Sequence, residues 1–370
     1  MKPLEYLVSL GQIVLLRLWK PKHKSIVIYL VPSEDIISGG ILSVIAMYKT
    51  MKKQESLCNV HTFLCNHPQA KRLTSYSMHN TDLKIQSFYR VLRAIPNESK
   101  VIFHVPATHL TKFIMGLNSF KFVNLIRDKS LKLSLNLLNQ NPFYFPDLEP
   151  LSENLALFKG ITQTTAHKAY DTDVNMGDLN IRSFYLGTQY GIDTHPFVPR
   201  QQRKKIMLVS HDEHKDKAQV LQKIQSLSID LEIIVVNDMP YDRYVYLQNL
   251  ALFSISFGEG LDFYFIRQFL SGGVGFGVFN KTFFTPDFEN LSVVFKSWED
   301  LSNNIALKIE RLYYNAISYK NTVAETRQVL AKYYNHQDYK KKLEILHKNW
   351  SRLGVLEIKS QDYSCLENKN

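Results

Sequence analysis

Cysteine is scarce in this chain of 370 residues, and its scarcity argues against both a cysteine metal site and a disulfide framework. The three cysteines, Cys58, Cys65 and Cys365, lack the spacing of a metal site and are too few for a disulfide framework. A reducing cytoplasm is the simplest setting for such a chain. No small-residue cleavage site follows the first apolar run, so the sequence shows no secretory signal peptide.

The sequence also lacks arginine-rich and low-complexity tracts, although it is basic overall. Lysine and arginine number 45 against 34 aspartates and glutamates, which gives a formal net charge of +11. Because this charge is spread along the chain without an aromatic-basic motif, nucleic acid is disfavoured as a partner. Phosphorylated ligands and an anionic membrane surface remain as partners.

No long hydrophobic run opens the chain, although its first 24 residues are rich in apolar side chains. The run is broken by Ser9, Gly11 and Gln12 and closed by Arg17, so it falls short of the roughly 20 residues that span a bilayer. Trp19 follows among several cations. This pattern predicts an amphipathic helix over residues 1–23 that lies in a membrane surface. The alternative is a helix packed on the protein's own core.

The remainder alternates between short apolar runs and segments of helical periodicity. Such alternation is typical of a parallel α/β sheet, and 370 residues favour two domains over one. The predicted strands lie at residues 24–32, 60–64, 101–105, 131–138, 158–162, 204–210, 231–237 and 250–256. The predicted helices lie at 41–53, 82–94, 108–116, 218–227, 241–249, 298–313 and 322–350.

These elements suggest two domains and their boundaries. Residues 171–203 have little periodicity and several glycines and prolines, so we place the connection between domains at the end of this segment. We expect an N-terminal domain over 24–200, a C-terminal domain over 201–325, and a helix with a polar tail over 326–370.

Residues 257–278 are the most informative stretch of the chain. They follow an apolar run, place Glu259 between Gly258 and Gly260, and continue through an aromatic segment into Ser271, Gly272 and Gly273. We interpret them as strand end, glycine-lined loop, helix, turn and strand. Ligands of open parallel sheets bind beyond the carboxyl ends of the strands, where a helix N-terminus favours an anion.

This stretch resembles the C-terminal-domain signature of retaining glycosyltransferases with the two-domain GT-B fold. Glu259 and Gly260 match the first glutamate of that signature and its glycine, and Gly272 matches the glycine of the later turn. The amino-acid sequence of residues 259–278 also resembles that of bacterial surface-polysaccharide glycosyltransferases. Arg267 stands where the family has a second glutamate, which binds the ribose of the nucleotide.

The resemblance implies two doubly wound Rossmann-like domains that face a cleft, and a nucleotide-sugar donor held mainly by the second domain. It gives Glu259 the catalytic role, through the donor sugar or the charge on its ring. Donor binding falls to Gly258, Gly260, Leu261, Arg267, Lys215 and Lys217, with the two lysines neutralising the diphosphate. No metal or other cofactor is implied.

The first half contributes candidates for the acceptor side of the cleft. Gly39 and Gly40 lie in the first strand–helix loop, where GT-B enzymes approach the donor diphosphate and the acceptor. Asn139 lies in a polar loop able to bind sugar hydroxyls. His104 and His167 each lie near a predicted strand end, where a structural role is the alternative to a sugar contact.

Three functions are compatible with these features. The first is a glycosyltransferase that transfers a sugar with retention to a glycan or lipid-linked acceptor, in synthesis of bacterial capsule or lipopolysaccharide. This reading expects a cytoplasmic protein attached peripherally to the inner face of the cell membrane. The second is a nucleotide-sugar epimerase on the same fold, which needs neither acceptor nor membrane helix. The third is a non-catalytic carbohydrate-binding protein, which Arg267 favours.

Overall fold

The computed structural model describes residues 25–32, 38–68, 73–76, 83–117, 120–176, 179–189 and 197–353. The chain divides into two compact units. Residues up to 166, 171–186 and 337 onward form the first unit, while 167–170 and 187–336 form the second. The boundaries expected after residues 200 and 325 both lie inside the second unit. The helix predicted over residues 1–23, the tail from 354 and Cys365 lie outside the described residues.

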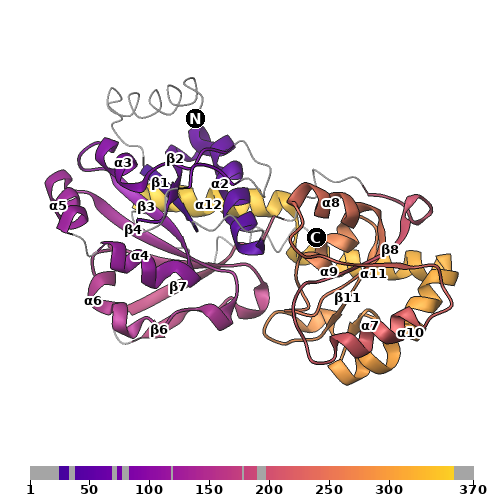
Figure 1. The fold of residues 1–370 in the computed structure, drawn as a ribbon. Helices are drawn as coiled ribbons and strands as arrows, with labels where there is room; N and C mark the ends of the chain where they lie inside the picture. Colours follow the sequence, from indigo (N-terminus) through magenta and orange to yellow (C-terminus); the bar gives the residue numbers. More distant parts are fainter. Residues whose placement is uncertain are drawn as a thin grey trace. The chain divides into compact units, whose positions relative to one another are not determined.

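The first unit is built on a seven-stranded sheet in the order β2-β1-β3-β4-β5-β7-β6 (Figure 1). Every pairing in it is parallel except that of β6 with β7. The strands are β1 (Ser25–Val31), β2 (Val60–Asn66), β3 (Lys100–Pro106), β4 (Lys132–Asn139), β5 (Ile161–Thr165), β6 (Val174–Met176) and β7 (Leu179–Tyr185).

Alternate residues of β1 point to opposite faces of this sheet, and each face has its own core. Ile26, Ile28 and Leu30 join a cluster with side chains of α3 (Phe88–Ala94), α4 (Leu110–Leu117) and α6 (Ser152–Leu155). Val27, Tyr29 and Val31 join a cluster with α2 (Gly39–Cys58) and α12 (His336–Leu353). A further helix, α5 (Phe120–Lys129), packs near α3.

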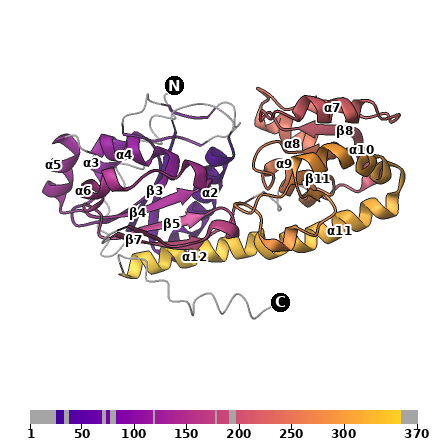
Figure 2. The ribbon, with the colours of Figure 1, turned by 90° about the horizontal axis from the view of Figure 1, so that it is seen from below.

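The last described helix, α12, belongs to this first unit. Its buried side chains Tyr339, Leu343, Leu346 and Trp350 recur at intervals of three and four residues, which is the spacing of one helical face. That face packs on the sheet side opposite α3 and α4 (Figure 2).

The second unit contains a five-stranded parallel sheet in the order β12-β11-β10-β8-β9. Its strands are β8 (Lys204–Val209), β9 (Glu232–Val235), β10 (Ala251–Ile255), β11 (Val274–Val278) and β12 (Val294–Phe295). Its α-helices are α7 (Lys217–Gln225), α8 (Tyr241–Leu250), α9 (Phe263–Leu270), α10 (Trp298–Tyr314) and α11 (Ala316–Tyr333). Two parallel α/β sheets confirm the predicted fold class.

Several predicted elements differ in extent or kind. The helix predicted over residues 82–94 is confined to α3, and the segment 171–203, predicted without regular structure, contains β6 and β7. The long helix predicted over 322–350 is two helices, because Tyr334 has φ −124° and ψ 50°, outside the helical region. Among the helices of the described residues, none is long and apolar enough to cross a membrane.

Candidate functional site

The glycine-lined loop leaves the carboxyl end of β10, next to the loop that leaves β8. The two strands are parallel neighbours in which Ile255 is paired with Val209. The backbone N–H of Phe257 donates to Ser210 Oγ over 2.8 Å, which joins the two loops at their roots. A side-chain carbon at Gly258 would lie only 2.9 Å from Asp212 Oδ2. The predicted catalytic loop therefore lies in direct contact with the loop after β8.

Gly260 fixes the path of this loop. It has a φ of +82°, and a side-chain carbon there would lie 2.6 Å from the carbonyl oxygen of Val278. Only glycine satisfies both constraints without strain. Gly277 is equally crowded, since a side-chain carbon there would lie 2.8 Å from the carbonyl oxygen of Gly260. Leu261 is buried behind the loop, Gly258 is exposed and Glu259 is half-buried.

Asp262 occupies the N-terminus of α9, where an anionic ligand was expected to bind. Its Oδ1 accepts hydrogen bonds from the backbone N–H groups of Tyr264 (2.8 Å) and Phe265 (3.2 Å), and its Oδ2 accepts one from Ser256 Oγ. Burial, and then the nearby carboxylate of Asp212, raise the pKa of Asp262 to about 6. These helix N–H groups are therefore bonded within the protein.

The two predicted diphosphate lysines differ in surroundings. Lys217 is buried, and its Nζ donates to the carbonyl oxygens of Asp212 (2.8 Å) and His211 (3.2 Å), so its ammonium shapes the loop after β8. Its Nζ also lies 5.7 Å from the centre of the Phe257 ring. Lys215 is exposed on the same loop. Of the two, Lys215 is therefore better placed to reach a ligand.

A stack of rings supports the pair of loops from α10. The Trp298 ring lies 3.7 Å from that of His214 and 5.7 Å from that of Phe257, nearly parallel to both. His214 belongs to the loop after β8, and Phe257 comes directly before Gly258. The stack holds both loops against one rigid helix.

Arg267 lies on α9 and is 1% exposed. Its Nη1 donates to Tyr241 Oη of α8 over 2.8 Å, and the guanidinium lies 5.7 Å from the centre of the Tyr241 ring. Its Nε and Nη2 are buried and have no hydrogen-bond partner among the described residues. A buried cation with unsatisfied donors is unfavourable, so an oxygen supplied by a ligand would stabilise it.

In the first unit, the start of α2 at Gly39 and Gly40 lies beside the polar loop that follows β4. Gly39 and Gly40 begin α2, with Ser38 as the capping residue, and Asn139 ends β4. The link is Gln140, whose Nε2 donates to the carbonyl oxygen of Gly40 over 2.9 Å. Asn139 is buried and donates to Gln163 Oε1 over 3.1 Å. These groups share the carboxyl edge of the first sheet.

The two histidines are buried and bonded within the protein. His104 is fully buried within β3, where it bonds to His347 of α12 (3.1 Å) and to Asn136 (3.0 Å). Burial, and then the neighbouring His347, hold the pKa of His104 well below its ordinary value. His167 is buried in the second unit beside Tyr334, whose hydroxyl lies 2.7 Å from its Nδ1, and burial lowers its pKa to about 3. Both contacts are those of structural residues.

The chain contains one Asp-x-Asp triplet, Asp171 to Asp173, but its carboxylates serve the fold. Asp171 accepts a hydrogen bond from Ser183 Oγ over 2.7 Å, and Asp173 accepts one from the Ser183 backbone N–H over 2.7 Å. Within the described ranges, no group of three or more histidine, cysteine, aspartate or glutamate side chains is placed to hold a metal ion.

Sequence reasoning gave no role to Asp262, Ser256, Asp212 and Trp298, and it placed Gln140 only in the polar loop with Asn139. Asp262 carried a recognisable signal, since an aspartate directly before an apolar helix is a preferred capping residue. Asp212, Gln140 and Trp298 make contacts between segments distant in sequence, which local patterns do not show.

Comparison with solved structures supports the fold. The α,α-trehalose 6-phosphate synthase of Burkholderia multivorans aligns with 86% of this chain and 98% of its own, at 10% identity and a TM-score of 0.50. A structure described as "Trehalose-6-phosphate from E. coli bound with UDP-2-fluoro glucose" aligns with 89% and 99%, at 9% identity and a TM-score of 0.50. The UDP-GlcNAc 2-epimerase of Neisseria meningitidis aligns with 81% and 94%, at 12% identity and a TM-score of 0.42. No protein-family model and no curated protein sequence matches the chain.

Together, the two α/β sheets and the two likenesses at a TM-score of 0.50 define the fold class. The chain has two Rossmann-like α/β units of the kind found in GT-B proteins. The candidate site is the pair of loops after β8 and β10 in the second unit, with Arg267 on the helix that follows.

Proposed function

We propose that the protein is a glycosyltransferase that uses a nucleotide-sugar donor. The observation that carries the proposal is the loop of residues 256–262, built around Gly260 and pressed against the loop after β8. In an open parallel sheet, this edge is where nucleotides and their phosphates bind.

The donor would lie against the second unit. Because Asp262 and Ser256 bond the N–H groups of Tyr264, Phe265 and Gly258, a diphosphate would approach the loop at the half-buried Glu259, beyond these bonded groups. The exposed Lys215 would add positive charge, and Arg267 would offer its unsatisfied nitrogens to the nucleotide. Fixed cations are valuable here because negative charge builds on the diphosphate as the sugar leaves.

Glu259 would act on the donor sugar. In the proposed reaction, the bond between the anomeric carbon and the diphosphate breaks, and a new bond to an acceptor hydroxyl forms on the same face of the ring. The hydroxyl proton passes to the departing phosphate oxygen. A carboxylate at Glu259 would stabilise positive charge that develops on the ring, without itself forming a bond.

The acceptor would be a glycan or a lipid-linked sugar, approached by Gly39, Gly40, Asn139 and Gln140. A role in bacterial surface-polysaccharide synthesis at an anionic membrane surface is the setting we propose, supported by the basic charge of the chain. We propose that the reaction needs no metal ion.

The test is consumption of nucleotide sugars by the purified protein, with and without acceptor sugars, followed by mass spectrometry and by NMR of the anomeric proton. Wild type should release a nucleoside diphosphate, and Glu259→Gln should lower that rate at least a hundredfold while the melting temperature stays unchanged. The matched control is Glu232→Gln, at the exposed amino end of β9, which should retain full activity.

Two outcomes would contradict this proposal. Full activity in Glu259→Gln would remove Glu259 from the mechanism. Formation of an epimerised nucleotide sugar without any acceptor would replace transfer with epimerisation.

A further inference from the structure

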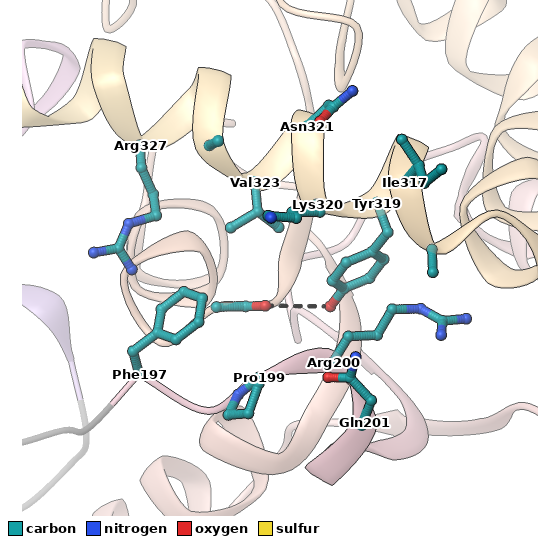
Figure 3. Close-up of a pocket in the computed structure, with 13 residues that line it drawn as sticks. Phe197, Pro199, Arg200, Gln201, Ile317, Tyr319, Lys320, Asn321, Val323 and Arg327 are labelled. Carbon is teal, nitrogen blue, oxygen red and sulfur yellow. Dashed lines mark hydrogen bonds between the residues drawn. The ribbon is translucent and has the colours of Figure 1, made fainter.

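The second unit contains a pocket of about 670 Å³ that lies apart from the loops after β8 and β10. One side is formed by residues 197–201 and the other by α11, whose side chains face that segment (Figure 3). The lining also includes Gly272, which precedes the amino end of β11. Because the candidate donor site is at the carboxyl ends of the strands, the pocket is at the opposite edge of the same sheet.

The charged side chains of the lining all have the same sign. Among the described residues, Arg200, Lys320 and Arg327 line the pocket and no aspartate or glutamate does. Figure 3 shows the guanidinium groups of Arg327 and Arg200 at opposite ends of the pocket with Lys320 between them, so an anion beside any of them would meet positive charge. A charged partner of negative sign is the ligand that this lining favours.

The two guanidinium groups are held in place by the protein and retain donors for a ligand. Arg200 Nη2 donates to the carbonyl oxygen of Tyr313 over 2.5 Å, while its buried Nε has no hydrogen-bond partner among the described residues. Arg327 Nη1 donates to the carbonyl oxygen of Leu270 over 3.0 Å, and its guanidinium lies 4.8 Å from the centre of the Phe197 ring. Guanidinium groups fixed in this way lose little entropy when they bind a phosphate or carboxylate.

The rest of the lining is largely apolar and in part exposed. Phe197 is 53% exposed and Ile317 is 73% exposed, and they are joined by Pro199, Val323 and aliphatic residues of α11. Exposed apolar side chains grouped around a concavity mark a binding site more often than isolated ones do. The volume is within the range of pockets that hold small ligands.

We propose that this pocket binds an anionic amphiphile, with a phosphate or carboxylate head near Arg327 and Lys320 and an apolar body that extends along α11 toward Ile317. The inference is independent of the proposed transferase activity, because it uses none of the residues of the donor site. The ligand has two possible sources, an anionic lipid or a soluble phosphorylated compound with an apolar part.

The experiment compares three probes by isothermal titration: octyl phosphate, octanol and inorganic phosphate. We expect octyl phosphate to bind at least tenfold more tightly than either of the others. Lys320→Gln with Arg327→Gln should weaken that binding at least tenfold, and Ile317→Ser should weaken it severalfold. Since Ile317 is exposed, Ile317→Ser tests the pocket without disturbing the core.

The matched control is Arg311→Gln, which removes an exposed cation of α10 outside the lining and should leave the affinity unchanged. Sedimentation with phosphatidylglycerol or phosphatidylcholine vesicles then separates the two sources. Loss of phosphatidylglycerol binding in the double variant would identify a lipid, and unchanged vesicle binding would identify a soluble ligand. Octyl phosphate that binds no better than octanol, or equal losses in Arg311→Gln, would overturn the proposal.

Discussion

Mild acid should loosen α12 from the first sheet, because the helix is anchored there by a buried, uncharged histidine. His347 Nδ1 lies 2.7 Å from the carbonyl oxygen of Leu343, and its Nε2 lies 3.1 Å from both Tyr29 Oη and His104 Nε2. Burial lowers the pKa of His347 to about 4. The unfolded chain, with a histidine pKa of about 6.5, therefore binds the proton more readily than the folded one.

The sign and size of the effect follow from this difference. The folded pKa is depressed, so the contribution to stability is complete above about pH 6.5 and falls as the pH drops toward 4. Between pH 7.5 and 4.5, one histidine of this kind should cost about 2.5 kcal/mol of unfolding free energy. His104 is shifted in the same direction and would add to the loss.

Urea denaturation of wild type and His347→Gln at pH 7.5 and pH 4.5 isolates the contribution of His347 to the pH dependence of the unfolding free energy. Any pH-independent cost of the substitution cancels when each protein is compared with itself. Wild type should lose about 2.5 kcal/mol more than the variant. Equal losses in the two proteins would refute the assignment of His347 as a buried neutral anchor.

The remaining predictions concern the second unit. Gly260→Ala should destabilise the protein by about 1–3 kcal/mol, because alanine is strained at a φ of +82° and its side chain would meet the Val278 carbonyl oxygen. A melting temperature equal to that of wild type would show that the loop is not held as described. Arg267→Met should raise the KM for a nucleotide sugar at least tenfold. The melting temperature should stay unchanged or rise, since the substitution removes a poorly paired buried charge. An unchanged KM would place Arg267 outside the donor site.

Local patterns in the sequence predicted the sheets well. Runs such as residues 25–31 and 251–255 favour buried parallel strands over helices, because they are short, apolar and bounded by other elements. The break between α11 and α12 was missed because Tyr334 is not a residue that ends helices by itself. Its non-helical backbone accompanies a hydrogen bond to His167, a contact across 167 positions of the chain.

The site was predicted less completely than the fold. Glycine spacing located the loop at Gly258 and Gly260, because each is crowded by another backbone or side chain. The surroundings of Lys217 and Arg267 could not be predicted, since both side chains turn toward partners that only the folded chain brings near. Both lysines after β8 were predicted to neutralise the donor diphosphate, and of the two only Lys215 is exposed.

The central claim is that the second unit binds a nucleotide sugar at the loops after β8 and β10. Its most direct test is the melting temperature of the protein with a panel of nucleoside diphosphates and nucleotide sugars. A ligand at a hundred times its Kd should stabilise the folded state by about 2.7 kcal/mol, so one nucleotide family should raise the melting temperature clearly. Lys215→Gln should reduce that shift, whereas Lys204→Gln, at the exposed amino end of β8, should preserve it. No shift with any member of the panel, or equal shifts in both variants and wild type, would contradict the account.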